Sequence, residues 1–379
     1  RDMGVVIEGP HHGRVTINGV GLQGLQAPPG SLYLGNSGTS MRLLSGLLAG
    51  QTFDTVLTGD ASLSKRPMGR VAKPLREMGA KIETADEGRP PLRISGTGRL
   101  MGMDYSMPMA SAQVKSCVLL AGLYASGSTS VTEPAPTRDH TERMLKGFGY
   151  PVKVDGATVT IESGHKLQAC KIDVPADISS AAFFMVAASI CEGADLLLEH
   201  VGINPTRIGV INILREMGGN IEMSNEREVG GEPVADIRVR YAPLKGIEIP
   251  VDQVPLAIDE FPALFIAAAC AEGRTILRGA EELRVKESDR IQVMADGLIT
   301  LGVKAEPTPD GIVIDGSRIG SGSVESHGDH RIAMSFAVAA LRAEGEIHIK
   351  DCANVATSFP DFVGLAQGVG MRVRLEENA

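Results

Sequence analysis

Charged and polar residues gather at one kind of place along this sequence, the expected N-terminal ends of helices. Four such groups precede largely apolar helices, and they are Gly35–Arg42, Ser111–Gln113, Asp259–Glu260 and His327–Arg331. Four more precede amphipathic helices, and they are Lys65–Arg70, Thr137–Arg143, Arg284–Arg290 and Thr357–Pro360. A helix N-terminus presents free backbone N–H groups and a positive dipole end, so it attracts anions. With arginine and lysine added, these groups predict a cleft for a polyanionic small molecule.

Each group also has a purely structural explanation. Serine, threonine, aspartate and asparagine at helix starts are ordinary N-caps, and Gly35–Arg42 could be a capped helix after a tight turn. Lys65-Arg66-Pro67 alone is typical of a solvated turn, and Ser111–Gln113 alone carries little information. Arg284–Arg290 is the hardest to explain as a solvated face, because cations and acids crowd one helix start beside apolar neighbours.

His327 and His330, with Asp329 between them, raise the question of a metal site. No third ligand accompanies them at a suitable spacing and no H-E-x-x-H occurs, so anion binding by Arg331 beside His330 is the favoured interpretation. The sequence also lacks a P-loop and a strand–G-x-G-x-x-G–helix motif, which disfavours ATP and NAD. No cysteine lies in the Ala61–Arg70 loop, which disfavours a reactive thiol there.

The elements that carry these groups repeat. Six times a helix-like stretch ends in a bulky residue followed by glycine, and a β-like run follows. The six pairs are Met3-Gly4, Met78-Gly79, Phe148-Gly149, Met217-Gly218, Leu301-Gly302 and Val369-Gly370. Their spacing is about 70 residues apart from one longer gap, which indicates a repeated α/β unit rather than a solenoid. Glycine after the last helical turn supplies the left-handed residue that lets the chain return as a strand. By this pattern, Arg1–Gly4 is the end of a helix.

Each repeat is expected to hold two helices of different character. The first is apolar nearly all round, as in Ser179–Ile190 and Pro262–Cys270, and the second is amphipathic, as in Val71–Met78 and Ile208–Met217. Short runs such as Ser128–Thr132 and Glu346–Lys350 are expected to be strands, and Gly316–Ser323 a loop. Fully buried helices covered by short strands predict an α/β fold with helices inside and sheets outside. The extended Ile172–Pro175 segment is the best domain junction, giving domains 1–172 and 173–379.

The composition of the chain narrows the classes of partner that it could bind. The net charge is −9 and aromatic residues make up 4%, which argues against nucleic-acid binding, since that needs a basic surface with stacking aromatics. No apolar run is long enough for a transmembrane helix and the start is no signal peptide, so we expect no membrane association. Cys117, Cys191 and Cys270 lie in apolar stretches typical of reduced core residues, which favours a cytoplasmic location.

Taken together, several of these motifs resemble a known family, EPSP synthase, the 3-phosphoshikimate 1-carboxyvinyltransferase of aromatic amino-acid biosynthesis. The motifs are Leu34–Thr39, Lys65–Gly69, Ser111–Gln113, Arg284–Arg290, Asp329–Arg331 and Ser358–Asp361. The resemblance covers the whole chain in order. It implies the enolpyruvyl transferase fold, an inside-out α/β barrel. This fold has two similar domains that are built from six repeated βαβαββ-type units in all. The first repeat would be truncated and would share domain 1–172 with repeats 2 and 3, while repeats 4 to 6 would make up domain 173–379.

The resemblance also implies a reaction, which needs no metal and no organic cofactor, and a set of residue roles. The 5-hydroxyl of shikimate 3-phosphate attacks C2 of phosphoenolpyruvate while C3 is protonated, and a tetrahedral intermediate then loses phosphate. Asp259 would take the hydroxyl proton, and Glu287, with Lys286 nearby, would handle the methylene proton. Phosphoenolpyruvate would be bound by Asn36, Gly38, Thr39, Arg66, Gln113, Arg290, His330 and Arg331. Shikimate 3-phosphate would be bound by Ser111, Ala112, Gln113, Arg138, Asp259 and Lys286.

Three departures from the common pattern resemble the subgroup called class II. The usual Ser-Ser-Gln is Ser111-Ala112-Gln113 here, Arg138 is present, and Thr357 stands where the commoner enzymes have a lysine. The best-known class II enzymes tolerate glyphosate. Gly38 nevertheless leaves its loop unobstructed, so we expect an intact enzyme to be a glyphosate target that this inhibitor blocks in competition with phosphoenolpyruvate.

The start of the chain departs most from the family's sequence pattern. The family begins with a Lys-Ser-x-Ser-x-Arg motif, and the similar Lys115-Ser116 lies inside a later helix instead. Judged by the repeat length, roughly 60 residues would precede Arg1. We therefore expect this chain to be a core fragment with little or no activity. Some members of the family are fused to other enzymes of the pathway, which allows an upstream fused domain.

Three rival functions fit the sequence less well. UDP-N-acetylglucosamine enolpyruvyl transferase shares the fold but normally uses a loop cysteine, which Ala61–Arg70 lacks. RNA 3′-phosphate cyclase, of related architecture, would need a nucleotide site that is not evident. A non-catalytic scaffold would have lost polar residues at random from the helix starts, yet nearly all of the expected ones remain.

Overall fold

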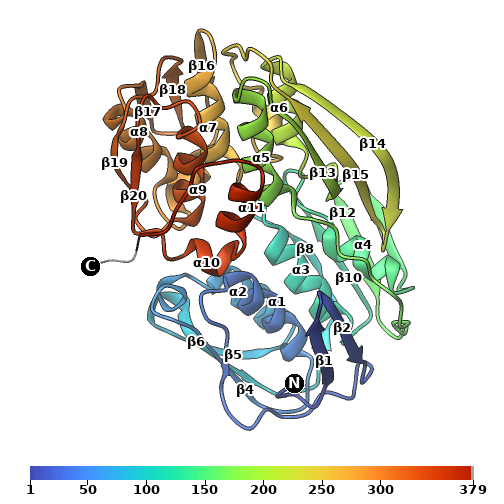
Figure 1. The fold of residues 1–379 in the computed structure, drawn as a ribbon. Helices are drawn as coiled ribbons and strands as arrows, with labels where there is room; N and C mark the ends of the chain where they lie inside the picture. The colour runs from blue at the N-terminus through green and yellow to red at the C-terminus, as the bar shows by residue number, and fades with distance from the viewer. Residues whose placement is uncertain (377–379) are drawn as a thin grey trace. The chain divides into compact units, whose positions relative to one another are not determined.

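The computed structural model describes residues 1–376, and its chain divides into two compact units, Arg1–Ile172 and Asp173–Ala379. Each unit has its own hydrophobic core and is built from helices that alternate with small sheets (Figure 1). This confirms the expected α/β class.

Unit 1 contains two four-stranded sheets with the same topology. Its helices are α1 (Gly38–Ala49), α2 (Gly69–Glu77), α3 (Ala112–Gly122) and α4 (His140–Gly147), with 3₁₀ turns η1 (Leu63–Lys65) and η2 (Asp86–Gly88). Its strands are β1 (Val6–His11), β2 (Arg14–Asn18), β3 (Leu32–Tyr33), β4 (Thr55–Thr58), β5 (Lys81–Ala85), β6 (Arg89–Ser95), β7 (Leu100–Met101), β8 (Asp104–Ser106), β9 (Ala125–Ser126), β10 (Ser128–Thr132), β11 (Val152–Asp155) and β12 (Thr158–Glu162). The sheet orders are β3-β4-β6-β5 and β8-β10-β12-β11, each with one parallel pair at the first edge and antiparallel pairs elsewhere. In chain order each sheet and its helices read βαβαββ.

Helices α1 and α3 pack closely against each other inside unit 1. Their contact depends on Gly46, since a Cβ atom there would lie 2.0 Å from the carbonyl oxygen of Cys117. The sheets cover these helices with alternating side chains. In β6, for example, Pro90, Leu92 and Ile94 are buried and the residues between them are exposed.

Unit 2 repeats the pattern. Its helices are α5 (Ile178–Ile190), α6 (Gly209–Glu216), α7 (Phe261–Cys270), α8 (Arg290–Thr300), α9 (His330–Ala339), α10 (Val355–Ser358) and α11 (Phe362–Gly368), with 3₁₀ turns η3 (Val251–Gln253) and η4 (Glu281–Val285). Its strands are β13 (Asp195–Gly202), β14 (Asn220–Val229), β15 (Glu232–Arg240), β16 (Arg274–Leu277), β17 (Lys304–Thr308), β18 (Gly311–Asp315), β19 (Gly322–Glu325) and β20 (Ile347–Lys350). The sheets are β13-β15-β14, β16-β18-β17 and the parallel pair β19-β20, and isolated parallel bridges at Ala176 and Glu248 stand where unit 1 has a fourth strand.

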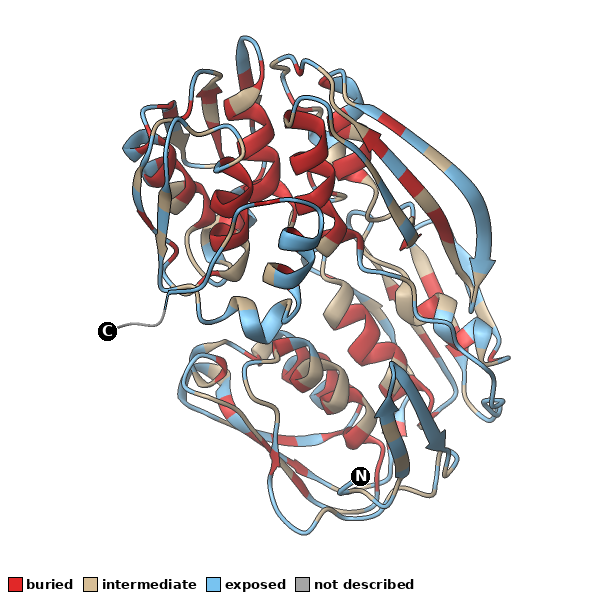
Figure 2. Cartoon of the chain, in the orientation of Figure 1, coloured by how far each residue is buried: buried red, intermediate tan, exposed pale blue. Residues whose placement is uncertain are grey.

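The apolar helices of unit 2 form its centre. Helices α5, α7 and α9 contact one another and are buried almost throughout, while the strands lie outside them (Figure 2). The apolar stretches Ser179–Ile190 and Pro262–Cys270 are thus buried helices, as expected from their lack of a polar face. This arrangement leaves the helix ends, rather than their sides, available for polar chemistry.

The six glycine turns share one geometry. All six glycines have positive φ, and each backbone N–H donates to the carbonyl three residues earlier, as Gly79 does to Arg76 and Gly4 to Arg1. In five of them the next residue donates to the carbonyl five residues before it, as Ala80 does to Leu75, which is the Schellman pattern. The repeat inferred from sequence therefore has a common hydrogen-bonded turn.

Three expectations about the elements were wrong in detail. Arg1–Gly4 forms a turn and no helix, although it keeps the Gly4–Arg1 hydrogen bond. After Gly370 the chain forms no strand as far as residue 376. Gly316–Ser323 is a loop only as far as Ser321, since β19 begins at Gly322, where its backbone pairs with β20.

Within residues 1–376, no helix is long and apolar enough to cross a membrane.

Candidate active site

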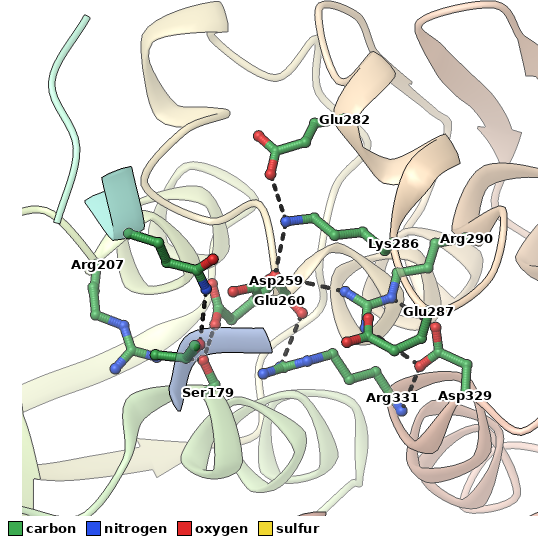
Figure 3. A network of polar contacts seen from close by, with 12 residues as sticks. Ser179, Arg207, Asp259, Glu260, Glu282, Lys286, Glu287, Arg290, Asp329 and Arg331 are labelled. Atoms are coloured by element: carbon green, nitrogen blue, oxygen red, sulfur yellow. Dashed lines mark hydrogen bonds and ion pairs between the residues drawn. The ribbon is translucent and has the colours of Figure 1, made fainter. Parts of the chain in front are cut away.

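Three helix starts meet in unit 2 and bring most of its predicted site residues together. Asp259 precedes Glu260, the N-cap of α7, while Arg290 is the first residue of α8 and His330 the first of α9. Figure 3 shows the resulting polar network. Helices α7 and α9 are the apolar helices of two successive repeats, and α8 is the amphipathic helix that lies between them in the chain.

Arg290 is the centre of this network. Its side chain is 1% exposed, and its Nε lies 2.8 Å from Oδ2 of Asp329, which is fully buried. Its Nη2 lies 2.7 Å from Oε2 of Glu287, and its Nη1 lies 3.6 Å from Oδ1 of Asp259. Asp329 also accepts hydrogen bonds from Ser288 and from the backbone N–H of Arg331, which makes it the N-cap of α9.

The charges of this buried pair stabilise each other. Burial alone would raise the pKa of Asp329, but the Arg290 charge and hydrogen bonds outweigh burial and hold that pKa below its usual value. Burial likewise opposes the charge of Arg290, yet the surrounding carboxylates raise its pKa. Nη1 of Arg290 is buried and has no hydrogen-bond acceptor among the described residues. A fixed guanidinium with one unused donor is suited to binding an anion.

Lys286 and Asp259 form a second ionic contact beside Arg290. Nζ of Lys286 lies 3.4 Å from Oδ1 of Asp259 and 2.6 Å from Oε1 of Glu282. The Asp259 side chain is 17% exposed and that of Glu287 is 36% exposed, so both carboxylates are accessible enough to exchange protons with a ligand. The structure thus brings together Asp259, Lys286 and Glu287, the three residues for which proton transfer was expected.

Arg331 and His330 complete the set in unit 2. Nη1 of Arg331 donates to the backbone oxygen of Asp259 at 3.0 Å, which links the start of α9 to the start of α7. Burial lowers the pKa of His330, and the neighbouring Arg331 charge lowers it further. His330 is therefore a neutral imidazole at pH 7.

The predicted residues of unit 1 form their own cluster at the starts of α1 and α3. Nε2 of Gln113 donates to Oγ1 of Thr39 at 2.8 Å, and Nη1 of Arg42 donates to Oε1 of Gln113. A Cβ atom on Gly38 would lie 3.2 Å from Nη1 of Arg42 and 3.3 Å from Nη1 of Arg66. Burial and the charges of Arg66 and Arg70 lower the pKa of Arg42. Several cations therefore surround Gly38, whose missing side chain leaves them room.

The other predicted residues of unit 1 lie at nearby helix starts. Ser111 caps α3 through its hydroxyl, which accepts from the N–H of Val114, and Ala112 is the first residue of that helix. Asn36 lies exposed in the turn before α1. Arg138 directly precedes Asp139, the N-cap of α4. The structure thus places every predicted residue of unit 1 at or beside a helix start or in the loop before one, as the sequence indicated.

Comparison with known proteins identifies the family. A family model described as EPSP synthase (3-phosphoshikimate 1-carboxyvinyltransferase) matches residues 1–365. The chain belongs to the EPSP synthase family. A relative from Methylococcus capsulatus named 3-phosphoshikimate 1-carboxyvinyltransferase is 70% identical over 375 residues, which are 99% of this chain and 86% of the relative. A relative of the same name from Legionella pneumophila is 59% identical, over 97% of this chain and 84% of its own length.

Solved structures agree with this assignment. The structure of EPSP synthase from Acinetobacter baumannii matches with a TM-score of 0.93 and 62% identity, covering 99% of this chain and 87% of that one. The likeness confirms the enolpyruvyl transferase fold, and the chain is an enzyme of the transferase class.

Sequence reasoning missed a hydrogen-bonded chain of side chains that is buried at Ser179 and Glu260 and reaches the surface at Asp177. Ser179 donates to Oε1 of Glu260 and accepts from Nη2 of Arg207 at 2.5 Å, and Arg207 also pairs with Asp177 at 2.9 Å. Burial raises the pKa of Glu260, although the Arg331 charge opposes this effect. The only sign of this chain in the sequence was the Asp259-Glu260 pair at a helix start. The sequence gave no reason to assign the two acids different surroundings or roles.

Arg42 was missed for a different reason. It lies inside Gly35–Arg42, which the sequence singled out, but its helical position gave it no evident role. The structure shows it hydrogen-bonded to Gln113, so it belongs to the same cluster.

The structure also places the thiols of two buried helices and the possible metal ligands. Burial raises the pKa of Cys117 and raises that of Cys270 to about 12, so both thiols are unreactive at neutral pH. Among residues 1–376, no three histidine, cysteine or acidic side chains are close enough together to hold a metal ion. This includes His327 and His330.

Proposed function

We propose that two clusters of residues hold the substrates of a 3-phosphoshikimate 1-carboxyvinyltransferase, which are phosphoenolpyruvate and 3-phosphoshikimate. One is the network around Arg290 in unit 2, and the other is the cluster at the starts of α1 and α3 in unit 1. In this reaction the 5-hydroxyl of 3-phosphoshikimate adds to C2 of phosphoenolpyruvate while C3 gains a proton. The tetrahedral intermediate then expels phosphate and loses a proton from C3, which leaves the enolpyruvyl ether. Both substrates are multiply anionic, and both clusters are rich in cations.

The observation that carries this proposal is the buried Nη1 of Arg290, which finds no hydrogen-bond acceptor among residues 1–376. Its other nitrogens are held by Asp329 and Glu287, so the guanidinium cannot turn away from a ligand. We assign Arg290 and Arg331 to the carboxylate and phosphate of phosphoenolpyruvate, because a guanidinium binds such groups through two parallel hydrogen bonds. His330 beside them supplies a neutral ring that can donate a hydrogen bond without adding charge.

The proton transfers are assigned to the acids of the same network. Asp259 takes the 5-hydroxyl proton, and the ammonium of Lys286, 3.4 Å away, stabilises its ionised form. Glu287 and Lys286 handle the C3 proton. Because Glu287 is only partly exposed and is held by Arg290 at 2.7 Å, its carboxylate keeps one orientation.

Unit 1 contributes the remaining contacts. We assign Arg66, with Asn36, Gly38, Thr39 and Gln113, to phosphoenolpyruvate, since Gly38 lets a ligand approach two guanidinium groups. We assign 3-phosphoshikimate to the start of α3 and to Arg138. That set comprises Ser111, Ala112, Gln113 and Arg138. The free N–H groups at the start of α3 favour a phosphate there. The cytoplasmic location expected from the cysteine pattern stays a prediction.

A matched pair of substitutions tests the assignment. Arg331→Lys keeps the charge but loses the planar fork, so kcat/KM for phosphoenolpyruvate should fall about 10–150-fold, the equivalent of one charged hydrogen bond. Arg342→Lys makes the same change at an ion pair with Glu192 on the surface of unit 2 and should stay within about twofold. Steady-state kinetics of the protein expressed from its natural gene measures both. Equal effects of the two substitutions would refute the assignment of Arg331.

A further inference from the structure

Unit 1 contains a buried lysine that the reaction described above does not use. Lys115 lies in α3 with a side chain only 1% exposed. Its Nζ is 2.7 Å from Oε1 of Glu142 and 3.1 Å from Oε2 of Glu133. Lysine is rarely buried unless it is paired. Here one ammonium joins two carboxylates that come from different segments.

The cluster ties together three pieces of the chain. Glu133 follows β10, Glu142 lies in α4, and Lys115 lies in α3, one helical turn after Ser111. Two hydroxyl contacts support these links. Oγ1 of Thr137 donates to Oε2 of Glu133 at 2.6 Å, and Oγ1 of Thr141 donates to Oγ of Ser116 at 2.7 Å. The segment between Glu133 and α4 carries Arg138.

Stability alone explains this cluster poorly. Buried ion pairs seldom stabilise a fold more than apolar side chains of similar volume, because desolvation offsets the attraction. Oε2 of Glu142 is also buried without a hydrogen-bond partner among the described residues, which adds a cost. An ionic contact does, however, fix direction and distance in a way that apolar contact does not. The cluster therefore specifies one arrangement of α3 relative to the segment after β10.

We propose that Lys115 is a positioning residue that sets Arg138 relative to the start of α3, so that both reach the phosphate of 3-phosphoshikimate. This inference rests on the proposed function, which assigns these two elements to that substrate. Lys115 pulls Glu133 toward α3, Glu133 holds Thr137, and Arg138 is the next residue. Glu142 anchors the other end of the same segment through α4. Losing the ammonium would leave two buried carboxylates that repel each other, and the segment would move.

The test separates the two substrates. In the protein expressed from its natural gene, Lys115→Met should raise the KM for 3-phosphoshikimate about 10–100-fold, as expected for a misplacement near 1 Å. The KM for phosphoenolpyruvate should change less than about threefold, since Lys115 pairs with Glu133 and Glu142 and not with the start of α1. Thr137→Val, which is isosteric and removes only the hydrogen bond to Glu133, should raise the KM for 3-phosphoshikimate about threefold. If the Lys115→Met protein fails to fold, the Thr137→Val protein still tests whether Glu133 positions Arg138.

Two controls distinguish positioning from loss of stability. Thr160→Val makes the same change as Thr137→Val at a hydroxyl pair with Ser130 in the same unit, and should leave both KM values unchanged. Ile82→Ala destabilises unit 1 from a buried position in β5 and should also leave their ratio unchanged. Unchanged KM values in the Lys115 and Thr137 variants, or equal rises for both substrates, would overturn the inference. A wild-type protein that does not turn over 3-phosphoshikimate would instead contradict the proposed function, and this inference with it.

Discussion

Replacing Asp329 with asparagine tests whether the buried pair with Arg290 organises unit 2. Asparagine has the same size and is as good an N-cap, so the hydrogen bond from the N–H of Arg331 should survive. What is lost is the negative charge 2.8 Å from Nε of a guanidinium that is 1% exposed. Removing one partner of a buried pair costs about 3–5 kcal/mol. Because Glu287 and Asp259 still face Arg290, we expect about 3 kcal/mol, the lower end.

Urea unfolding, followed by circular dichroism, measures this loss. With a slope of about 2–3 kcal/mol/M, the midpoint should fall by about 1–1.5 M. Asp289→Asn is the matched control, because Asp289 also caps a helix and pairs with an arginine, Arg284, but is 36% exposed. An exposed pair of this kind contributes up to about 1 kcal/mol. A loss below about 1 kcal/mol in Asp329→Asn, or equal losses in both variants, would refute the reasoning.

The same pair has a pH signature. Since the folded-state pKa of Asp329 is lowered below its ordinary 3.8, its stabilising contribution is complete above pH 3.8 and is lost as pH falls through the folded-state pKa. The difference in unfolding free energy between wild type and Asp329→Asn should therefore be constant from pH 7 to about pH 4 and shrink below it. A difference that grows on acidification would contradict the assigned direction.

Three further predictions follow from packing and charge. Gly46→Ala should destabilise unit 1 by about 1–3 kcal/mol or more, because its Cβ would lie 2.0 Å from the carbonyl oxygen of Cys117. Gly364→Ala should instead stabilise unit 2 by about 0.5–1 kcal/mol, because its Cβ would have no atom of residues 1–376 within 4 Å. Thermal unfolding of both variants would expose an error if the signs agreed. The His330 ring should titrate below pH 6.5 when its protonation is followed by NMR. The stability that its neutral form contributes is therefore present above pH 6.5 and is lost as pH falls through the folded-state pKa. A titration midpoint above pH 6.5 would be incompatible with burial of the ring beside a guanidinium. Gly38→Ala should raise the KM for phosphoenolpyruvate about 3–10-fold, because two guanidinium groups must give way by a few tenths of an ångström. An unchanged KM would show that they do not bind this substrate.

Local patterns predicted the elements well because each element follows from its own residues. Ser128–Thr132 is β10 residue for residue, and the apolar stretch Ser179–Ile190 is α5 apart from its first residue. The glycine turns were predictable for the same reason, since a positive φ after a helix is a local requirement. Polar residues at helix starts, including those beside Asp259 and Arg290, could be recognised without knowing the tertiary contacts.

Contacts between distant residues could not be predicted in this way. Ser179 and Glu260 are 81 residues apart, and Arg290 and Asp329 are 39 apart. They meet because α5, α7, α8 and α9 pack in one arrangement, which depends on the shapes of many buried side chains together. The resemblance to a family gave candidate substrate-binding residues, but it gave none of the residues that hold these candidates in place. Lys115 illustrates this gap, because a lysine in an apolar helix has no local partner.

The central claim is that the two clusters carry out one carboxyvinyl transfer. Its most direct test is phosphate release by the protein expressed from its natural gene, measured with phosphoenolpyruvate alone and together with 3-phosphoshikimate. The account predicts one phosphate per enolpyruvyl product, release only when both substrates are present, and a kcat about 10²–10⁴-fold lower in Asp259→Asn. Release that does not depend on 3-phosphoshikimate, or that persists unchanged in Asp259→Asn, would contradict it.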